Sequence, residues 1–289
     1  MDTDTDSGTW HLTHDLDDFL LRAGDFLRSR PAPHTVPLTV TETLRTRGPR
    51  VYGDGEPELG VLRRDGKARA AFFRTPPHWL NLTALTPGEA DGLAARLAAL
   101  GRPLPGVSAD RDTAAAFAAA WQRHTGVTVT LRRRQRLYRL GTLTAPRPLP
   151  PGGARIAART DHELLVRWHD EFAAAVGAGT VRDSAEWADA RIDSGGVTLW
   201  ETPEGTPVAM AGTSPLVAGQ VRVTGVYTPA PHRGRGYAGA VTAEVSRAAL
   251  ATGASEVLLF TDLANPTSNG LYQRIGYGPV ADFAVYGFG

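Results

Sequence analysis

The sequence predicts a mixed α/β fold, with a mixed sheet of the α+β kind, in two tandem domains. Two observations carry the domain prediction. The chain has 289 residues, which exceeds the length of a typical single domain. Residues 144–153 are rich in proline and glycine and cannot sustain a helix or an inner strand, because proline fixes φ and removes a backbone donor. We therefore expect a first domain over 1–145, a linker over 146–153 and a second domain over 154–289.

Composition limits the function classes. Hydrophobic residues make up 42% of the chain and charged residues 21%, which is an ordinary globular balance. The net charge of +1 gives no global field that recruits nucleic acid or a membrane. Cysteine is absent and the eight histidines show no metal-ligand spacing, so we expect no thiol catalysis and no metal. The acidic, polar start and the absence of a long apolar run predict a cytoplasmic protein. Nothing in the sequence indicates an oligomeric state.

The second half gives the clearest element order, β-α-α-β-β-β-α-β-α-β. Its first helix begins at Thr160 or Asp161, either of which can cap it, and carries an apolar face that includes Trp168. Ser184 is expected to cap the second helix, which runs to residue 192. A helix at 237–251 and a short one at 268–274 follow. The expected strands are 154–157, 197–201, 207–216, 221–227, 256–261 and one near 282–288.

The first half repeats this order in weaker form. Helices are expected at 14–28, 36–46, 87–100 and 111–124, and strands at 59–64, 68–74, 79–84, near Val107 and at 127–140. Thr86-Pro87 before one long helix mirrors Thr228-Pro229 before the other. These echoes predict an internal duplication.

The loop 233–238, Arg-Gly-Arg-Gly-Tyr-Ala, predicts an anion site between the strand 221–227 and the helix 237–251. Glycines let the main chain approach a phosphate, and the first helical N–H groups point outward unpaired. Arg233 and Arg235 add positive charge beside them.

A dinucleotide site is the first alternative, because Gly234, Gly236 and Gly239 spell G-x-G-x-x-G and Asp262 follows at a suitable distance. Two features argue against it. Residues 228–232, with two prolines, separate the strand from the glycines, and only 263–289 remain after Asp262.

A second motif favours another class. The loop matches R/Q-x-x-G-x-G/A, and 265–277 contains an Asn and then Leu-Tyr-x-x-x-Gly-Tyr. In this order, the two motifs resemble the signatures of the GCN5-related N-acetyltransferase (GNAT) family. The sequence of residues 227–238 is most similar to the FR47-like branch of that family and to bacterial two-domain acetyltransferases. The resemblance covers residues 155–289. It implies an acyl-CoA-dependent N-acyltransferase with acetyl-CoA as co-substrate and no metal, acting on a small-molecule amine bound between the halves.

The resemblance also implies roles for individual residues. A bulged strand, with Gly225 at the bulge, would hold the pantetheine arm, the loop would hold the pyrophosphate, and Tyr272 would be the general acid that protonates the thiolate. The implied cofactor-binding residues are Val226, Tyr227, Thr228, Arg233, Gly234, Arg235, Gly236, Tyr237, Ala238, Asn265 and Ser268. Each has an ordinary alternative: a solvated loop, an aromatic packed on the sheet for Tyr272, and a turn with a Ser268 helix cap at 265–268.

The general base has no clear motif, because the strand 221–227 carries no carboxylate. Candidates on the first helix of the second half are His169, Asp170 and Glu171. We select Glu171, which lies toward the helix end expected to face the acceptor; a water chain is the alternative.

The first half has no equivalent loop. Its long helix starts at 86–91 with Glu89 and Asp91, which we expect to occupy the positive end of the helix dipole. This predicts a degenerate copy and one cofactor site per chain. The competing hypothesis is a non-catalytic acyl-CoA-binding module that acts through protein contacts.

Overall fold

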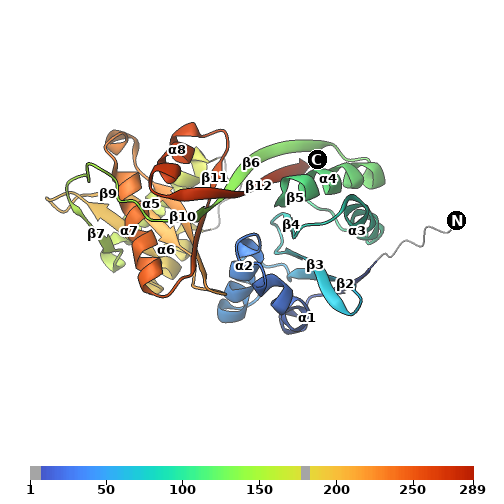
Figure 1. Ribbon diagram of the computed structural model, residues 1–289. Coiled ribbons are helices and arrows are strands. Elements are labelled where there is room, and N and C mark those ends of the chain that lie inside the picture. The colour runs from blue at the N-terminus through green and yellow to red at the C-terminus, as the bar shows by residue number, and fades with distance from the viewer. Residues whose placement is uncertain (1–7, 177–182) are drawn as a thin grey trace. The chain divides into compact units, whose positions relative to one another are not determined.

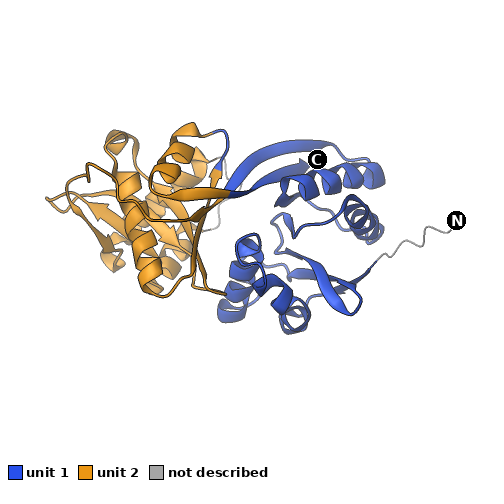
Figure 2. Cartoon of the chain, in the orientation of Figure 1, with its two compact units in different colours: residues 1–137, 262–264, 280–289 blue, residues 138–261, 265–279 orange. Residues whose placement is uncertain are grey.

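A computed structural model describes residues 8–176 and 183–289, which form two compact units (Figure 2). Unit 1 comprises Met1–Leu137, Asp262–Ala264 and Val280–Gly289, and unit 2 comprises Tyr138–Thr261 and Asn265–Pro279. The last ten residues therefore belong to unit 1, although most of the second half of the chain belongs to unit 2. Residues 146–153 lie within unit 2.

The sheet of unit 1 has the strand order β1-β2-β3-β4-β5-β12-β6. The pairs β1–β2, β2–β3, β3–β4 and β5–β12 are antiparallel, and β4 pairs parallel with β5. Its strands are β1 (Thr9–Thr13), β2 (Glu58–Arg64), β3 (Lys67–Arg74), β4 (Leu80–Leu82), β5 (Gly106–Asp110), β6 (Val129–Leu140) and β12 (Tyr277–Phe288). Strand β1 is not among the predicted elements, and β12 begins at Tyr277 rather than near Asp282.

Four helices complete unit 1 (Figure 1): α1 (Leu16–Arg28), α2 (Thr35–Arg47), α3 (Pro87–Ala99) and α4 (Arg111–Thr125). One buried cluster joins α3 and α4 to the sheet. In it Trp121 stacks on Phe117 and on Phe288, so the last strand of the chain supplies part of this core. Gly106 is required where β5 pairs with β12, because a Cβ at this position would clash with the Tyr286 carbonyl oxygen.

Unit 2 has the strand order β6-β11-β10-β9-β8-β7. Its remaining strands are β7 (Gly153–Ile156), β8 (Val197–Glu201), β9 (Pro207–Thr213), β10 (Gln220–Tyr227) and β11 (Glu256–Asp262). Strands β7 to β10 pair antiparallel in succession, and β10 pairs parallel with β11. A parallel neighbour requires a crossover, which the long helix after β10 supplies. The predicted order of elements in the second half is confirmed.

Two helix pairs cover the sheet of unit 2: α5 (His162–Ala175) with α6 (Ser184–Asp193), and α7 (Tyr237–Ala251) with α8 (Pro266–Arg274). Side chains alternate between two buried clusters along the strands, as the pleat requires. On β8, Leu199 joins the α5–α6 cluster and Trp200 joins the α7–α8 cluster. The helices therefore lie on opposite faces of the sheet.

One predicted helix cap is wrong. The other holds in position only, because Asp161 is the N-cap residue of α5 but its side chain makes no capping hydrogen bond. Asp183 caps α6, because its carboxylate accepts from the Ala185 amide, and Ser184 is the first helical residue. The start of α5 follows a 3-10 turn, Arg159–Asp161, and no side chain caps it. Asp161 instead accepts two hydrogen bonds from Arg155, at 2.6 and 2.8 Å. An ion pair with a neighbouring strand has taken the place of the expected local cap.

Candidate functional site

Strands β10 and β11 are paired over only part of their length. Their register runs from Gln220–Glu256 to Val223–Leu259, and residues 224–227 have no partner in β11. On the other edge, the pairing with β9 shifts between Thr224 and Tyr227, and Gly225 has a φ of +58°. The predicted bulge is confirmed. Backbone groups that point toward β11 beyond Val223 are thereby left outside the β10–β11 ladder and can bind an extended ligand.

The N-terminus of α7 carries no side-chain cap. Its N-cap residue is Gly236, in the left-handed region at φ +84°, and Gly234 also has a positive φ of +76°. The Arg233 guanidinium folds back and donates from Nε to the Thr228 carbonyl oxygen at 3.0 Å. Bare amides at a helix start, reached through an exposed glycine loop, are an arrangement that can bind an anion.

Thr228 joins β10 to this loop, and its hydroxyl group is buried. That oxygen has no hydrogen-bond partner among the residues that the structure describes. An unsatisfied buried hydroxyl costs roughly 1–3 kcal/mol. A polar ligand passing from the bulge to the loop would satisfy it, so this feature fits a bound pantetheine–pyrophosphate chain.

The 265–268 segment forms the start of α8. Asn265 is the N-cap, and its side chain accepts from the Ser268 amide at 3.0 Å. The alternative of a Ser268 cap is wrong, because the helix begins at Pro266. Asn265 thus has a structural role in the turn beside the loop.

Tyr272 lies on α8 in the same buried cluster as Tyr237 of α7, and Val226 of β10 packs against that cluster. The fold thus brings together three predicted site residues from three elements. Burial, with a smaller effect of Tyr277, raises the pKa of Tyr272 far above the usual tyrosine range. The phenol therefore stays protonated, as a proton donor must. It also packs against Tyr277, at 6.2 Å between ring centroids, so the packing alternative holds as well.

Tyr227 points to the other face of the sheet, into the cluster of Trp168 and Phe172. Its hydroxyl group donates to Glu171 at 2.7 Å. Burial, and then the Glu171 carboxylate, raise the pKa of Tyr227. The bond fixes the Glu171 carboxylate beside the end of β10.

The other two base candidates are engaged elsewhere. Ser184 of α6 donates to Asp170 at 2.5 Å and contacts His169 Nδ1 at 2.8 Å. His169 also stacks on Trp187, with ring centroids 4.1 Å apart, and burial lowers its pKa. His169 and Asp170 therefore join α5 to α6. Of the three candidates, Glu171 is the one held next to β10.

A pocket of about 550 Å³ lies within unit 2, where α5, the start of β9, the end of β10 and the 229–232 turn meet. Glu171 and Tyr227 line it, as do Arg167, Thr206 and His232, which no sequence motif indicates. Trp168 forms part of its wall. Only the tertiary contacts identify these additional residues.

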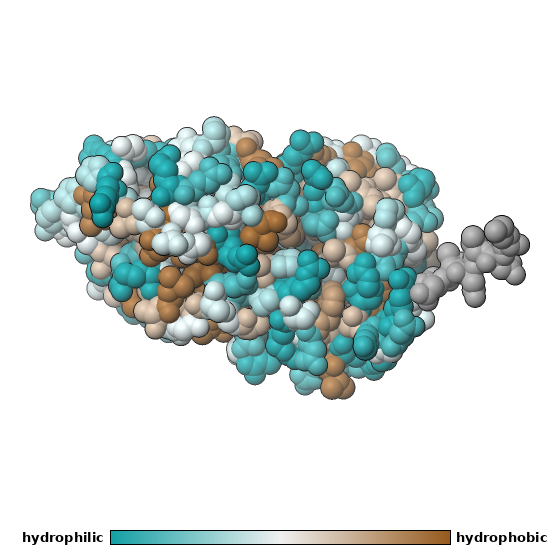
Figure 3. Space-filling model, in the orientation of Figure 1, coloured by the Kyte–Doolittle hydropathy of each residue, from teal (hydrophilic) through white to brown (hydrophobic). Residues whose placement is uncertain are grey.

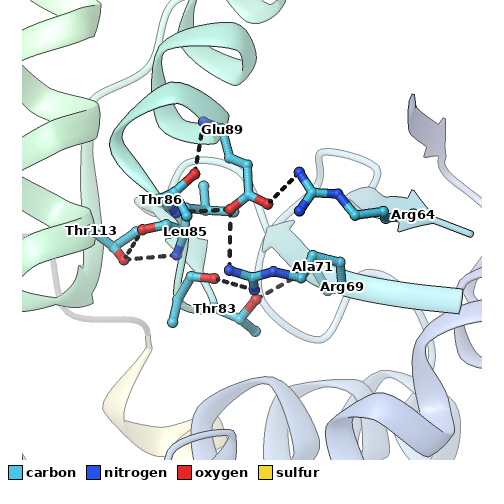
Figure 4. Close-up of polar contacts among 9 residues, drawn as sticks. Arg64, Arg69, Ala71, Thr83, Leu85, Thr86, Glu89 and Thr113 are labelled. Atoms are coloured by element: carbon cyan, nitrogen blue, oxygen red, sulfur yellow. Dashed lines mark hydrogen bonds and ion pairs between the residues drawn. The ribbon is translucent and has the colours of Figure 1, made fainter. Parts of the chain in front are cut away.

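The corresponding helix start in unit 1 is closed by its own side chain (Figure 4). Thr86 and Glu89 form a capping box, in which Glu89 accepts from the Thr86 amide at 2.8 Å. The Glu89 carboxylate also pairs with Arg69 at 3.3 Å and Arg64 at 3.8 Å. Asp91 does not share this position. It pairs with Arg123 and His124 at the end of α4.

The dinucleotide alternative receives no support. Asp262, its expected ribose ligand, accepts from the Ala264 amide in a local turn.

The face in Figure 3 mixes hydrophilic and apolar residues, and no described helix is long and apolar enough to cross a membrane. Within residues 8–176 and 183–289, no group of three or more His, Asp and Glu side chains is arranged to hold a metal ion.

Comparison with known proteins identifies the fold. The family model described as "Acetyltransferase (GNAT) family" matches residues 162–277. The solved structure of a GCN5-related N-acetyltransferase from Sphaerobacter thermophilus has a TM-score of 0.62 at 18% identity, covering 96% of this chain and 94% of that one. The chain has the GNAT fold.

Two further structures extend the GNAT fold over both units. An acetyltransferase of the GNAT family from Colwellia psychrerythraea has a TM-score of 0.59 at 13% identity, covering 97% and 98% of the two chains. A tandem GNAT protein from the clavulanic acid biosynthesis pathway has a TM-score of 0.56 at 14% identity, covering 96% and 98%. No curated protein sequence matches significantly. The family match is confined to residues 162–277, and the structures show the GNAT fold.

Proposed function

We propose that the protein is an acyl-CoA-dependent N-acetyltransferase that transfers the acetyl group of acetyl-CoA to the amine of a small molecule by direct attack. One observation carries the proposal. An uncapped glycine helix start follows, after the loop of residues 228–236, a strand that is bulged and has parted from its parallel neighbour. Phosphates and an extended amide-bearing arm need these two features in succession.

Acetyl-CoA would be held by backbone and loop groups of unit 2. The amides of Val226 and Thr228 would bind the pantetheine arm and the thioester carbonyl, and the Thr228 hydroxyl would gain its missing partner. The loop and the start of α7 would bind the pyrophosphate, with Asn265 and Ser268 beside it. The proposed holding residues are Val226, Tyr227, Thr228, Arg233, Gly234, Arg235, Gly236, Tyr237, Ala238, Asn265 and Ser268.

Two side chains would move protons. Glu171, oriented by Tyr227, would accept a proton from the attacking amine. Tyr272, kept protonated by burial, would give its proton to the departing thiolate. Glu171 and Tyr272 lie on opposite faces of the sheet. This arrangement suits the reaction, because the attacking amine and the departing thiolate would lie on opposite sides of the carbonyl carbon.

The proposal also covers the rest of the chain. Residues 1–145 would be a degenerate GNAT copy without a cofactor, 146–153 a connecting segment and 154–289 the catalytic domain. The sequence of the 227–238 segment favours the FR47-like branch.

Isothermal titration should show one acetyl-CoA bound per chain, and thiol release should follow with a suitable amine. Tyr272→Phe keeps the ring and removes the acid, so it should leave acetyl-CoA affinity unchanged and lower the turnover by roughly 10²-fold or more. Tyr138→Phe, another buried phenol of unit 2, is the matched control. No binding of acetyl-CoA would refute the proposal, whereas binding without thiol release for any amine would favour a non-catalytic acyl-CoA-binding module.

A further inference from the structure

The pocket between α5 and the end of β10 is lined by Tyr227. The preceding residue of the strand, Val226, is the one whose amide is proposed to bind the thioester carbonyl, so the pocket lies beside the proposed thioester position. Its volume of about 550 Å³ falls within the range of roughly 300–1,000 Å³ that is usual for small-molecule sites. All its lining residues belong to unit 2. A molecule bound there can reach the bulged segment.

The pocket contains two opposite charges at a fixed spacing. Arg167 and Glu171 are four residues apart on α5 and both line the pocket. Side chains at this spacing lie on one helix face, with roughly 5–6 Å between Cβ atoms. An Arg that precedes its Glu is the weaker arrangement of such a pair. Glu171 is instead bonded to Tyr227.

The charges select among amines. A polycation would meet the Arg167 guanidinium against a single carboxylate. A molecule that carries an ammonium group next to a carboxylate meets Glu171 and Arg167 with both charges matched. The α-amino acids have this arrangement.

The remaining walls are largely apolar. Trp168 is only 4% exposed, and Leu164, Pro207 and Pro229 line the same space. Burial of apolar surface against these walls stabilises an apolar side chain and gives nothing to a charged one.

We propose that this pocket is the acceptor site and that its substrate is an α-amino acid with an apolar side chain, acetylated on its α-amine. This rests on the proposed acetyltransferase function. The amine nitrogen forms a bond to the acetyl carbon while the bond from that carbon to the CoA sulfur breaks. The ammonium group loses two protons, which pass through Glu171 to solvent. Tyr272 gives its proton to the thiolate and takes one back from solvent, so that the net release is one proton. The Arg167 guanidinium holds the carboxylate of the amino acid.

The test compares amino acids with their decarboxylated analogues in the full chain. L-leucine is paired with 3-methylbutylamine and L-phenylalanine with 2-phenylethylamine, with spermidine as the polycation. Thiol release and the mass of the product are measured. We expect both amino acids to be acetylated with kcat/KM at least tenfold above their analogues. Arg167→Gln should raise KM for the amino acids roughly 10- to 100-fold and leave the analogues unchanged, whereas Arg167→Lys should restore most of the affinity. Arg247→Gln, on the exposed side of α7, is the control for a lost positive charge.

Titration with acetyl-CoA separates the two levels of failure. A chain that does not bind acetyl-CoA refutes the proposed function itself. A chain that binds acetyl-CoA yet prefers the analogues or spermidine, or acetylates none of the amines, overturns the amino-acid assignment. An equal effect of Arg167→Gln on amino acid and analogue also overturns it.

Discussion

Two helix starts in this protein have the same place in the order of elements and opposite chemistry. The N-terminus of α7 has a glycine at the N-cap, no side-chain cap and two arginines in the preceding loop. The N-terminus of α3 has a complete capping box, and its Glu89 is only 7% exposed and paired with two arginines. A helix start can satisfy its amides with an internal carboxylate or leave them for a ligand, and each unit uses one solution.

The comparison shows how a helix start without a bound anion can be stabilised by its own side chains. Glu89 supplies the negative charge that a phosphate would bring, and Arg64 and Arg69 hold it (Figure 4). The α7 start has no such anion among the described residues. It therefore depends on solvent or a ligand.

The largest expected effect comes from giving α7 the chemistry of α3. Gly236→Asp places a carboxylate at the N-cap, where the nearest atom to an added Cβ, in Pro150, is 3.8 Å away. We expect acetyl-CoA affinity to fall roughly 30-fold or more by titration, since the carboxylate repels the pyrophosphate and competes for the helix amides. Gly236→Asn has the same shape and backbone strain without the charge. Equal affinities of the two variants would show that no anion binds at the α7 start.

A smaller effect is expected from opening α3. Glu89→Gln removes the charge between Arg64 and Arg69 and weakens the capping box, so the free energy of unfolding of unit 1 should fall by about 1–2 kcal/mol. Hydrogen exchange of the α3 and β3 peptides measures this change. Asp91→Asn, in the same helical turn, removes exposed ion pairs with Arg123 and His124 and should therefore change exchange less than Glu89→Gln does.

Titration of the Glu89→Gln chain with acetyl-CoA should still give one site, because unit 1 lacks the glycine loop as well as the bare amides. A second bound acetyl-CoA would mean that the Glu89 carboxylate alone prevents unit 1 from binding acetyl-CoA.

The smallest effect concerns the two cores. Unit 2 buries Tyr272 and Tyr277, and burial raises the pKa of Tyr277 to about 12. In the core of unit 1, the large aromatic residue of α4 is Trp121, which does not titrate. Above pH 10 the unfolded chain loses phenolic protons that folded unit 2 retains, so the stability of unit 2 should decline from pH 10 to about 12.

Hydrogen exchange at pH values across this window should show loss of protection in α7 and α8 before α4. Tyr277→Phe should reduce the pH dependence, although it also loses the bond of the Tyr277 hydroxyl to Ser246. Parallel decline of both units would show that buried phenols do not set the difference.

The sequence alone determined the elements and the anion loop. Periodicity and proline placement predicted the helices of both halves within a few residues, because these signals are local. The glycines at 234 and 236 predicted a main chain that a phosphate can approach closely, and both have positive φ. The bulge at Gly225 was implied by the family resemblance.

Tertiary structure decided what depends on contacts far apart in sequence. It assigned the last strand to unit 1, where Phe288 packs on Trp121. It separated Tyr227 from Val226 onto different faces, tied His169 and Asp170 to Ser184, and left Glu171 beside β10. Local preferences fix where a helix begins and which residues share its face, but which side chain meets that face depends on packing between distant segments.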